Sequence, residues 1–223
     1  MRTAIVVGSG AGGATVAREL QGSYQVTVLE AGRPFHRLEL RRPTIERIRR
    51  TRLLADPRLI RAAFPPMQVR TSGGMVMVNG IGVGGTTTMA TGNGVRADGA
   101  LRSLGIDLDP EFDEIGREIH LATDHQTRWH RTTGRLFEAF TATGLDPHPI
   151  PKMQTGVAAC RHCGRCVLGC PYGAKWDSRR YLEDAVAKGA RVVTGCRVER
   201  PAARRSTRQP VTTLAPLATA SSR

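Results

Sequence analysis

Two groups of residues in this sequence have the types and spacing to do chemistry, and the first lies at the N-terminus. Gly8, Gly10 and Gly13 form a G-x-G-x-x-G pattern directly after an apolar, β-branched run, and an acid, Glu30, follows about 20 residues later. Gly8 permits a tight turn, Gly10 lets the backbone approach a pyrophosphate, and Gly13 lets the next helix pack closely on the strand. The pattern is typical of a dinucleotide-binding site.

The second group is a cysteine cluster. Cys160, Cys163, Cys166 and Cys170 have the spacing C-x2-C-x2-C-x3-C and precede Pro171, as in the run that holds iron–sulfur clusters in bacterial ferredoxins. Zinc modules usually separate two C-x2-C pairs by a longer span, and a reducing compartment disfavours disulfides. Only one run is present, whereas in two-cluster ferredoxins the fourth cysteine serves the other cluster. Three interpretations stay open: a [4Fe–4S] cluster, another metal, or a metal-free role in packing the loop.

The elements that position the glycine pattern are visible in the sequence. Residues 3–7 predict a fully buried strand of a parallel sheet, residues 14–20 have helical spacing of apolar positions, and residues 25–29 predict a second strand. The amide groups at the N-terminus of the helix favour an anion such as a phosphate. Glu30 ends the second strand where an adenosine ribose would present its hydroxyls, and its charge disfavours a 2′-phosphate. The dinucleotide is therefore NAD or FAD rather than NADP.

The rest of the chain divides into segments of different composition. Residues 73–94 are rich in glycine, but interleaved methionine, valine and isoleucine favour a loop packed around a ligand over a flexible linker. Periodicity predicts three further helices: one begins at Asp109, one covers 132–143 and one covers 179–188. It also predicts a strand over 190–193. Residues 201–223 have almost no large apolar side chains, which predicts a disordered basic tail.

Charge and hydropathy limit the partners. The formal net charge is +14, but residues 33–70 hold eleven arginines against three acids, which we interpret as a solvated surface, and the tail holds four against none. Aromatic residues make up 4% of the chain, so stacking platforms for single-stranded bases are scarce and we expect no nucleic-acid partner. No apolar run approaches the roughly 20 residues that span a bilayer, and the run after Arg2 is shorter than a signal-peptide core. We expect a cytoplasmic protein with reduced cysteines and no membrane partner.

Several blocks resemble the glucose–methanol–choline (GMC) oxidoreductases, flavoenzymes that oxidise alcohols. Residues 6–14 and 28–32 are similar to the N-terminal fingerprint of that family, and residues 82–87 are similar to its G-x-G-G-[ST]-[ST] signature. The cysteine loop and Lys175 resemble the branch with long-chain alcohol oxidases and cholesterol-oxidase-like proteins. The resemblance implies FAD as the cofactor, with contacts from Gly8, Ser9, Gly10, Ala11, Gly12, Gly13, Glu30, Ala31, Gly84, Gly85, Thr86, Thr87, Asn93 and Val198.

The chain also departs from the family pattern. Many members place an asparagine at the position of Ala90, whereas here an asparagine stands later, at Asn93. The resemblance further implies that the strand ending near Val198 approaches the adenine. Family members are usually much longer, with the substrate domain and the catalytic histidine in the C-terminal half. We therefore expect a truncated α/β chain: an incomplete Rossmann-like FAD-binding domain of parallel strands and helices over residues 1–200, with a Cys-rich loop over 157–176, followed by the disordered tail 201–223.

The resemblance implies hydride transfer from the carbinol carbon of an alcohol or sterol-like substrate to flavin N5. None of the six histidines matches the catalytic position, so no catalytic residue is assigned, and the substrate site is expected to be absent. We expect little or no alcohol oxidation by this chain alone, and an electron-acceptor protein as a further partner. The alternative is an iron–sulfur electron-transfer flavoprotein fragment that uses a [4Fe–4S] cluster at the cysteine quartet.

Overall fold

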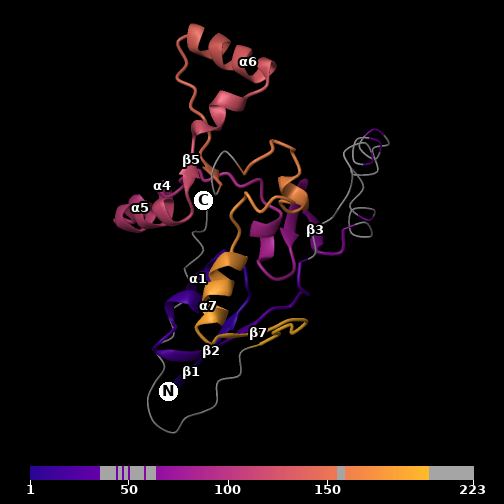
Figure 1. The fold of residues 1–223 in the computed structure, drawn as a ribbon, viewed down its shortest axis with the longest axis vertical. Coiled ribbons are helices and arrows are strands. Elements are labelled where there is room, and N and C mark those ends of the chain that lie inside the picture. The colour runs from indigo at the N-terminus through magenta and orange to yellow at the C-terminus, as the bar shows by residue number, and fades with distance from the viewer. Residues whose placement is uncertain are drawn as a thin grey trace, which may run out of the picture.

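The computed structural model has a three-stranded parallel sheet at one end, near the N-terminus (Figure 1). The described residues are 1–35, 64–154 and 159–200, together with Thr44, Arg47, Arg50 and Arg58. The sheet has the order β1–β2–β7, from β1 (Arg2–Val7), β2 (Tyr24–Leu29) and β7 (Arg191–Val193). Helix α1 (Ala11–Glu19) connects β1 to β2. The predicted β–α–β start of a Rossmann-like α/β fold is confirmed.

The core lies between one face of this sheet and two helices. Val6, Val26 and Val28 are at most 8% exposed, and they pack with Ala14 and Ala17 of α1, which are fully buried. The alanines keep this face of α1 flat, so the helix can lie close to the strands. Helix α7 (Arg179–Ala187) packs beside α1 and adds Tyr181, Leu182 and Ala185 to the same core (Figure 1).

The prediction of a fully buried first strand is wrong. Ile5 and Val7 are 69% and 61% exposed, whereas Val6 between them is buried. Successive side chains of a strand point to opposite faces, and α1 and α7 pack on the face that carries Val6. Within the part of the chain that the structure describes, β1 is therefore half-buried.

The first part of the glycine-rich segment is a hairpin and not a packed loop. Strands β3 (Met67–Ser72) and β4 (Met75–Gly80) pair antiparallel, and Gly73 and Gly74 form the turn with φ of +56° and +77°. Two-residue turns of this kind require positive φ, which glycine adopts without strain. Residues Met75 to Val78 are 44% to 65% exposed, so four of the apolar residues that suggested a packed loop belong to an open strand, whereas Val83, after that strand, does pack against the core.

Among the remaining elements, α6 lies at the opposite end of the molecule from β1 and β2 (Figure 1). These elements are the 3-10 helix η2 (Gly85–Thr88), α4 (Gly99–Arg102), α5 (Asp109–Glu118), β5 (Leu121–Ala122), the 3-10 helix η3 (Asp124–Arg128), α6 (Arg131–Ala142), β6 (Lys152–Met153) and the 3-10 helix η4 (Cys166–Leu168). The helices predicted from Asp109, over 132–143 and over 179–188, and the strand over 190–193, are confirmed to within a residue or two at their ends. None of the helices among the described residues has the length and apolar character needed to cross a bilayer.

One further prediction is wrong, and two others are not tested by the structure. The prediction of a strand that ends near Val198 is wrong, because β7 ends at Val193 and Val198 lies outside any strand. Residues 201–223, which the sequence predicts to be a disordered tail, lie outside the described residues, and so does most of the arginine-rich segment 33–70, which we interpret as a solvated surface. The end of that segment, from Met67, belongs to β3.

Candidate dinucleotide-binding site

The glycine turn between β1 and α1 has the backbone geometry that a pyrophosphate needs. Gly8 has φ of +90°, and its N–H donates to the carbonyl oxygen of Leu29 at 2.8 Å. A Cβ on Gly13 would lie 2.0 Å from the carbonyl oxygen of Gly8, so only glycine lets α1 pass this close to the end of β1. Helix α1 begins at Ala11 after Gly10, which has no side chain to cap it. The first-turn amides, which have no intrahelical acceptor, can therefore donate to an anion.

The second glycine block lies directly against this turn. Gly84 and Gly85 have φ of +93° and +54°, and Gly85 begins η2. A Cβ on Gly85 would lie 2.9 Å from the Cα of Gly10. Two glycine blocks separated by 75 residues of sequence are thus in contact, backbone to backbone. The sequence predicted that both blocks serve one site, and the structure brings them together.

Ser9 and Glu30 connect the first turn to the end of β2. The carboxylate of Glu30 is 6% exposed; its Oε2 accepts from the backbone N–H of Ser9 at 2.9 Å and from the Ser9 hydroxyl at 2.5 Å. Its Oε1 accepts from the N–H of Gly32 at 2.8 Å. The Ser9 hydroxyl also accepts from the N–H of Gly84 at 3.1 Å. Glu30 therefore organises the turn itself, and a contact with a ribose hydroxyl stays a prediction.

Ser178, which the sequence did not indicate, joins both glycine blocks. It is fully buried, and its hydroxyl lies 3.0 Å from the carbonyl oxygen of Gly84 and 3.3 Å from that of Ser9. Its backbone N–H donates to the hydroxyl of Thr87 at 3.0 Å. A serine directly before a predicted helix indicates only an N-cap, and here the side chain makes no capping bond. Only the tertiary contact shows what Ser178 does.

Three other predicted contacts lie elsewhere or are otherwise engaged. The side-chain oxygen of Asn93 accepts a hydrogen bond from Lys152 of β6, and Asn93 itself is exposed. The hydroxyl of Thr86 accepts from the N–H of Gly80 at 3.1 Å. Val198 lies beyond β7. The site that the structure assembles thus consists of the turn from Gly8 to Gly13 and the backbone from Gly84 to Thr87, without the Thr86 hydroxyl.

The cysteine quartet surrounds a small cavity without forming a metal site. Cys160, Cys163, Cys166 and Cys170 all line a cavity of about 50 Å³, and all are free thiols. Among the described residues, no three His, Cys, Asp or Glu side chains are arranged to hold a metal ion. Burial raises the pKa of the Cys166 thiol, which opposes the thiolate form that ligation requires.

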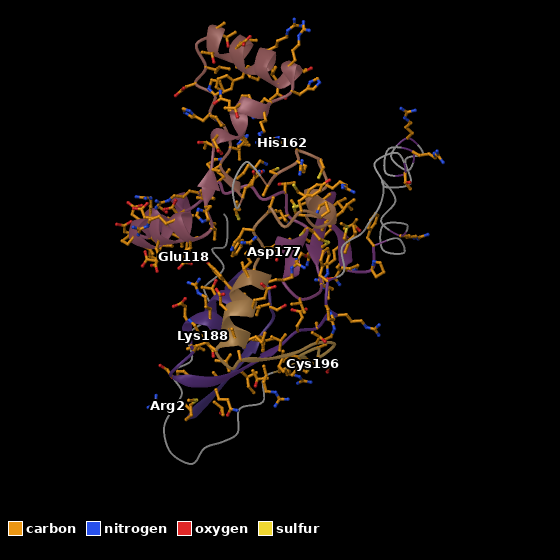
Figure 2. All side chains as sticks on the ribbon, viewed as in Figure 1. Arg2, Glu118, His162, Asp177, Lys188 and Cys196 are labelled. Carbon is orange, nitrogen blue, oxygen red and sulfur yellow. The ribbon has the colours of Figure 1, made fainter. Side chains whose placement is uncertain are left out.

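The fifth cysteine lies apart from the quartet. The backbone N–H of Cys196 donates to the carbonyl oxygen of Glu30 at 2.9 Å, and Figure 2 shows Cys196 near the sheet and His162, in the Cys-rich loop, well away from it. Cys196 therefore adds no ligand to the loop. The arrangement does not support the [4Fe–4S] interpretation, and a role in loop packing is the one it favours.

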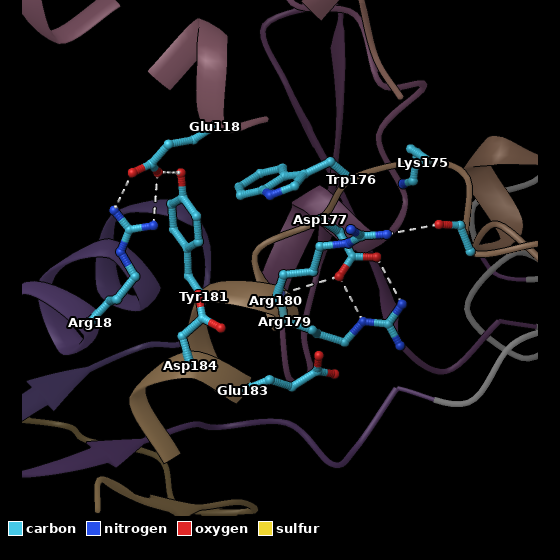
Figure 3. A pocket seen from close by; sticks show the side chains of 11 residues that line it. Arg18, Glu118, Lys175, Trp176, Asp177, Arg179, Arg180, Tyr181, Glu183 and Asp184 are labelled. Carbon is cyan, nitrogen blue, oxygen red and sulfur yellow. Dashed lines mark hydrogen bonds and ion pairs between the residues drawn. The ribbon is translucent and has the colours of Figure 1, made fainter. Parts of the chain in front are cut away.

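A larger pocket beside α7 is not the dinucleotide site. It has a volume of about 630 Å³ and is lined mostly by charged side chains, some of which pair with one another (Figure 3). Arg18 donates to Glu118 at 2.8 Å, the hydroxyl of Tyr181 donates to Glu118 at 2.6 Å, and Arg179 donates to Asp177 at 2.7 Å. Hydrogen bonds from Arg18 and Tyr181 lower the pKa of Glu118, and burial together with Glu118 raises the pKa of Tyr181 to about 12. None of the predicted cofactor contacts lines this pocket.

Comparison with known proteins agrees with the geometry. A family model described as GMC oxidoreductase matches residues 2–213. An uncharacterized GMC-type oxidoreductase of Mycobacterium tuberculosis (strain H37Rv) is 34% identical over 211 residues, which cover 88% of this chain and 32% of that protein. A cholesterol oxidase of the same strain is 26% identical over 223 residues, which cover 85% of this chain and 38% of that protein.

The chain thus spans about a third of the length of these relatives. The matched region contains both glycine blocks, the segment that joins them through Ser178, and the Cys-rich loop. This protein belongs to the GMC oxidoreductase family, and the described residues form part of the N-terminal FAD-binding domain of that family.

Proposed function

We propose that this chain holds FAD for an oxidoreductase that acts on the CH–OH group of an alcohol or sterol-like substrate, and that it does not oxidise alcohols by itself. When bound, FAD supplies the hydride acceptor, and the protein supplies binding and orientation. The main support for the proposal is the contact between Gly10 and Gly85, because it brings two glycine-rich turns, of the kind that bind phosphate groups, together at one site.

The residues present fit the pyrophosphate of FAD. The amides at the start of α1 offer donors with partial positive charge, and Gly8, where an added Cβ would meet no atom within 4 Å, leaves the surface beside them open. The Ser9, Glu30 and Ser178 hydrogen bonds fix both glycine blocks before any ligand arrives. A site prepared in this way loses little conformational entropy on binding.

The remainder of the proposal concerns the reaction. The cholesterol oxidase relative supports a sterol-like alcohol as the substrate. Because this chain covers only 38% of that relative, we propose that the reaction requires additional polypeptide. We assign no catalytic base to this chain, and we propose that a separate acceptor takes the electrons from the reduced site. Purified chain with FAD and an alcohol or sterol should show no reduction of the flavin absorbance, and turnover by the chain alone would contradict this part.

The binding part is tested by a pair of glycine variants. Gly85→Ala places a Cβ against Gly10, whereas Gly73→Ala introduces the same backbone strain, at φ of +56° instead of +54°, in the open hairpin turn. We expect Gly85→Ala to raise the Kd for FAD at least tenfold, about 1.4 kcal/mol, and Gly73→Ala to leave it within about twofold. Quenching of FAD fluorescence on titration measures both. Absence of FAD binding by the unmodified chain, or equal Kd values for the two variants, would refute the proposal.

A further inference from the structure

Lys175 is a buried cation to which the proposed reaction gives no role. It is 5% exposed, and its Nζ donates to the carbonyl oxygens of Thr87 at 2.7 Å, Thr88 at 2.8 Å and Ala90 at 2.8 Å. An ammonium group has three N–H donors, so all three are satisfied by the turn that follows Gly85. Burial lowers the pKa of Lys175, and the charge of Asp177 opposes this shift.

The stem of Lys175 reaches this position past a glycine. Gly92 has φ of +75°, and a Cβ there would lie 3.0 Å from the Cγ of Lys175 and 3.3 Å from its Cδ. The backbone around the lysine is also fixed: the N–H of Trp176 donates to the carbonyl oxygen of Met153 at 2.9 Å, and the N–H of Met153 donates to that of Gly92 at 2.7 Å. The ammonium therefore approaches the turn from a rigid support.

Neighbours of Lys175 contact the same block of glycines. Ser178 bonds to Gly84 and Thr87, and a Cβ on Gly84 would lie 2.8 Å from the Cγ of Arg179. The guanidinium of Arg179 is paired with Asp177 at 2.7 Å and 2.8 Å. The segment from Lys175 to Arg179 thus lies along the whole second block, and Lys175 holds its far end.

The Cys-rich loop lies over the lysine. Cys166, Cys170, Tyr172 and Ala174 line the same small cavity as Lys175. In the metal-free role, the loop packs over Lys175 and helps to keep water from its ammonium group and from the three carbonyl groups that it contacts.

We propose that Lys175 is a positioning residue for FAD: its ammonium holds the turn from Thr87 to Ala90 so that Gly85 stays against Gly10. The inference rests on the proposed function, since it concerns the same site. Hydrogen bonds to charged donors are the stronger kind, and three of them converge here on one short turn. An apolar side chain of the same length would remove the donor from all three carbonyl groups, of which that of Thr88 is buried.

Lys175→Met tests this inference, with Lys188→Met, an exposed lysine at the end of α7, as the matched control. We expect Lys175→Met to raise the Kd for FAD at least tenfold and the control to change it less than twofold. In FAD-free protein, amide hydrogen exchange followed by NMR should accelerate at least tenfold at Met89 and Ala90, whose N–H groups donate to the carbonyl oxygen of Thr86. Exchange in β1 and β2 should stay unchanged, which separates local positioning from a general loss of stability.

A second pair of variants serves if Lys175→Met does not fold. Gly92→Ala displaces the lysine stem, whereas Gly173→Ala, at φ of +64° with no atom within 4 Å of its added Cβ, carries similar strain without that contact. Only Gly92→Ala should weaken FAD binding and accelerate exchange at Met89 and Ala90.

The outcomes for the two proposals are distinct. If the unmodified chain does not bind FAD, the proposed function fails, and the exchange measurement on FAD-free protein still decides whether Lys175 holds the turn. If the chain binds FAD but Lys175→Met or Gly92→Ala leaves both Kd and exchange at their original values, the proposed function stands and the role of Lys175 is refuted.

Discussion

Glu30 shows how one carboxylate can prepare a binding site from within. Its two oxygens accept three hydrogen bonds, two from Ser9 and one from Gly32, and they do so in a buried position. Charged acceptors make the strong hydrogen bonds of proteins, and they fix the direction of the donors. The Ser9 hydroxyl in turn accepts from Gly84, so the carboxylate acts on both glycine blocks.

Replacing this carboxylate by an amide should therefore destabilise the protein. In Glu30→Gln the amide NH2 must face a backbone or hydroxyl donor, which leaves at least one buried N–H without an acceptor. We expect the free energy of unfolding to fall by about 1–3 kcal/mol. Urea unfolding followed by circular dichroism measures it, with Glu114→Gln on the exposed side of α5 as the control. Equal stability of the two variants would mean that the Ser9 and Gly32 bonds contribute nothing net.

At the scale of elements, one polar contact joins three helices that are far apart in the sequence. Arg18 of α1 and Tyr181 of α7 both donate to Glu118 at the end of α5, and the guanidinium of Arg18 lies 4.0 Å from the centre of the Tyr181 ring. Figure 3 shows the three side chains converging. This contact links the outlying α5 to the pair of helices that covers the sheet.

The contact should depend on pH. Its hydrogen bonds lower the pKa of Glu118 below the ordinary value of 4.5, so its stabilisation is complete above pH 4.5 and is lost as the pH falls through the pKa of the folded state. Glu118→Gln should lower the free energy of unfolding by about 0.5–1 kcal/mol at pH 7, as expected for a partly exposed pair. The difference from the unmodified chain should shrink at pH 3. A gap in urea unfolding that stays constant from pH 7 to pH 3 would contradict this assignment, and Glu138→Gln, exposed on α6, is the control.

At the scale of the whole molecule, the sheet is covered on one side only within the described residues. Parallel sheets are found almost only with both faces covered, because the crossover connections between their strands place helices on the faces. Here Ile5 and Val7 are largely exposed, while Val6 and Val26 on the other face are buried. The relatives are about three times as long as the matched region, which leaves ample sequence for a second covering layer in those proteins.

The open face should therefore bind a hydrophobic dye. We expect the fluorescence of 8-anilinonaphthalene-1-sulfonate with the isolated chain to fall in the double variant Ile5→Thr/Val7→Thr, with the free energy of unfolding changed by less than about 0.5 kcal/mol. Val26→Thr, on the buried face, should instead lower that free energy by about 1–3 kcal/mol. Dye fluorescence that is the same for the double variant and the unmodified chain would show that this face is not what the dye contacts.

The sequence by itself determined the elements and the type of site. The glycine turn, its helix, the second strand and Glu30 follow one another along the chain, so local patterns were sufficient to predict a dinucleotide-binding β–α–β unit and its resemblance to the GMC oxidoreductases. The same patterns failed where burial or contact depends on which distant part of the chain packs against a residue. They did not show that Ile5 and Val7 are exposed, that Met75 to Val78 form an open strand, or that the cysteines surround a small cavity without forming a metal site.

Only the tertiary structure decided how the site is held together. Ser178 and Lys175 reach the second glycine block from more than 80 residues further along the chain. A serine before a helix and a lysine after a cysteine run have no local signature of such contacts, because hydrogen bonds to distant backbone groups leave no period in the sequence. Burial and long-range pairing are properties of the folded chain, and they turned two separate glycine patterns into one site.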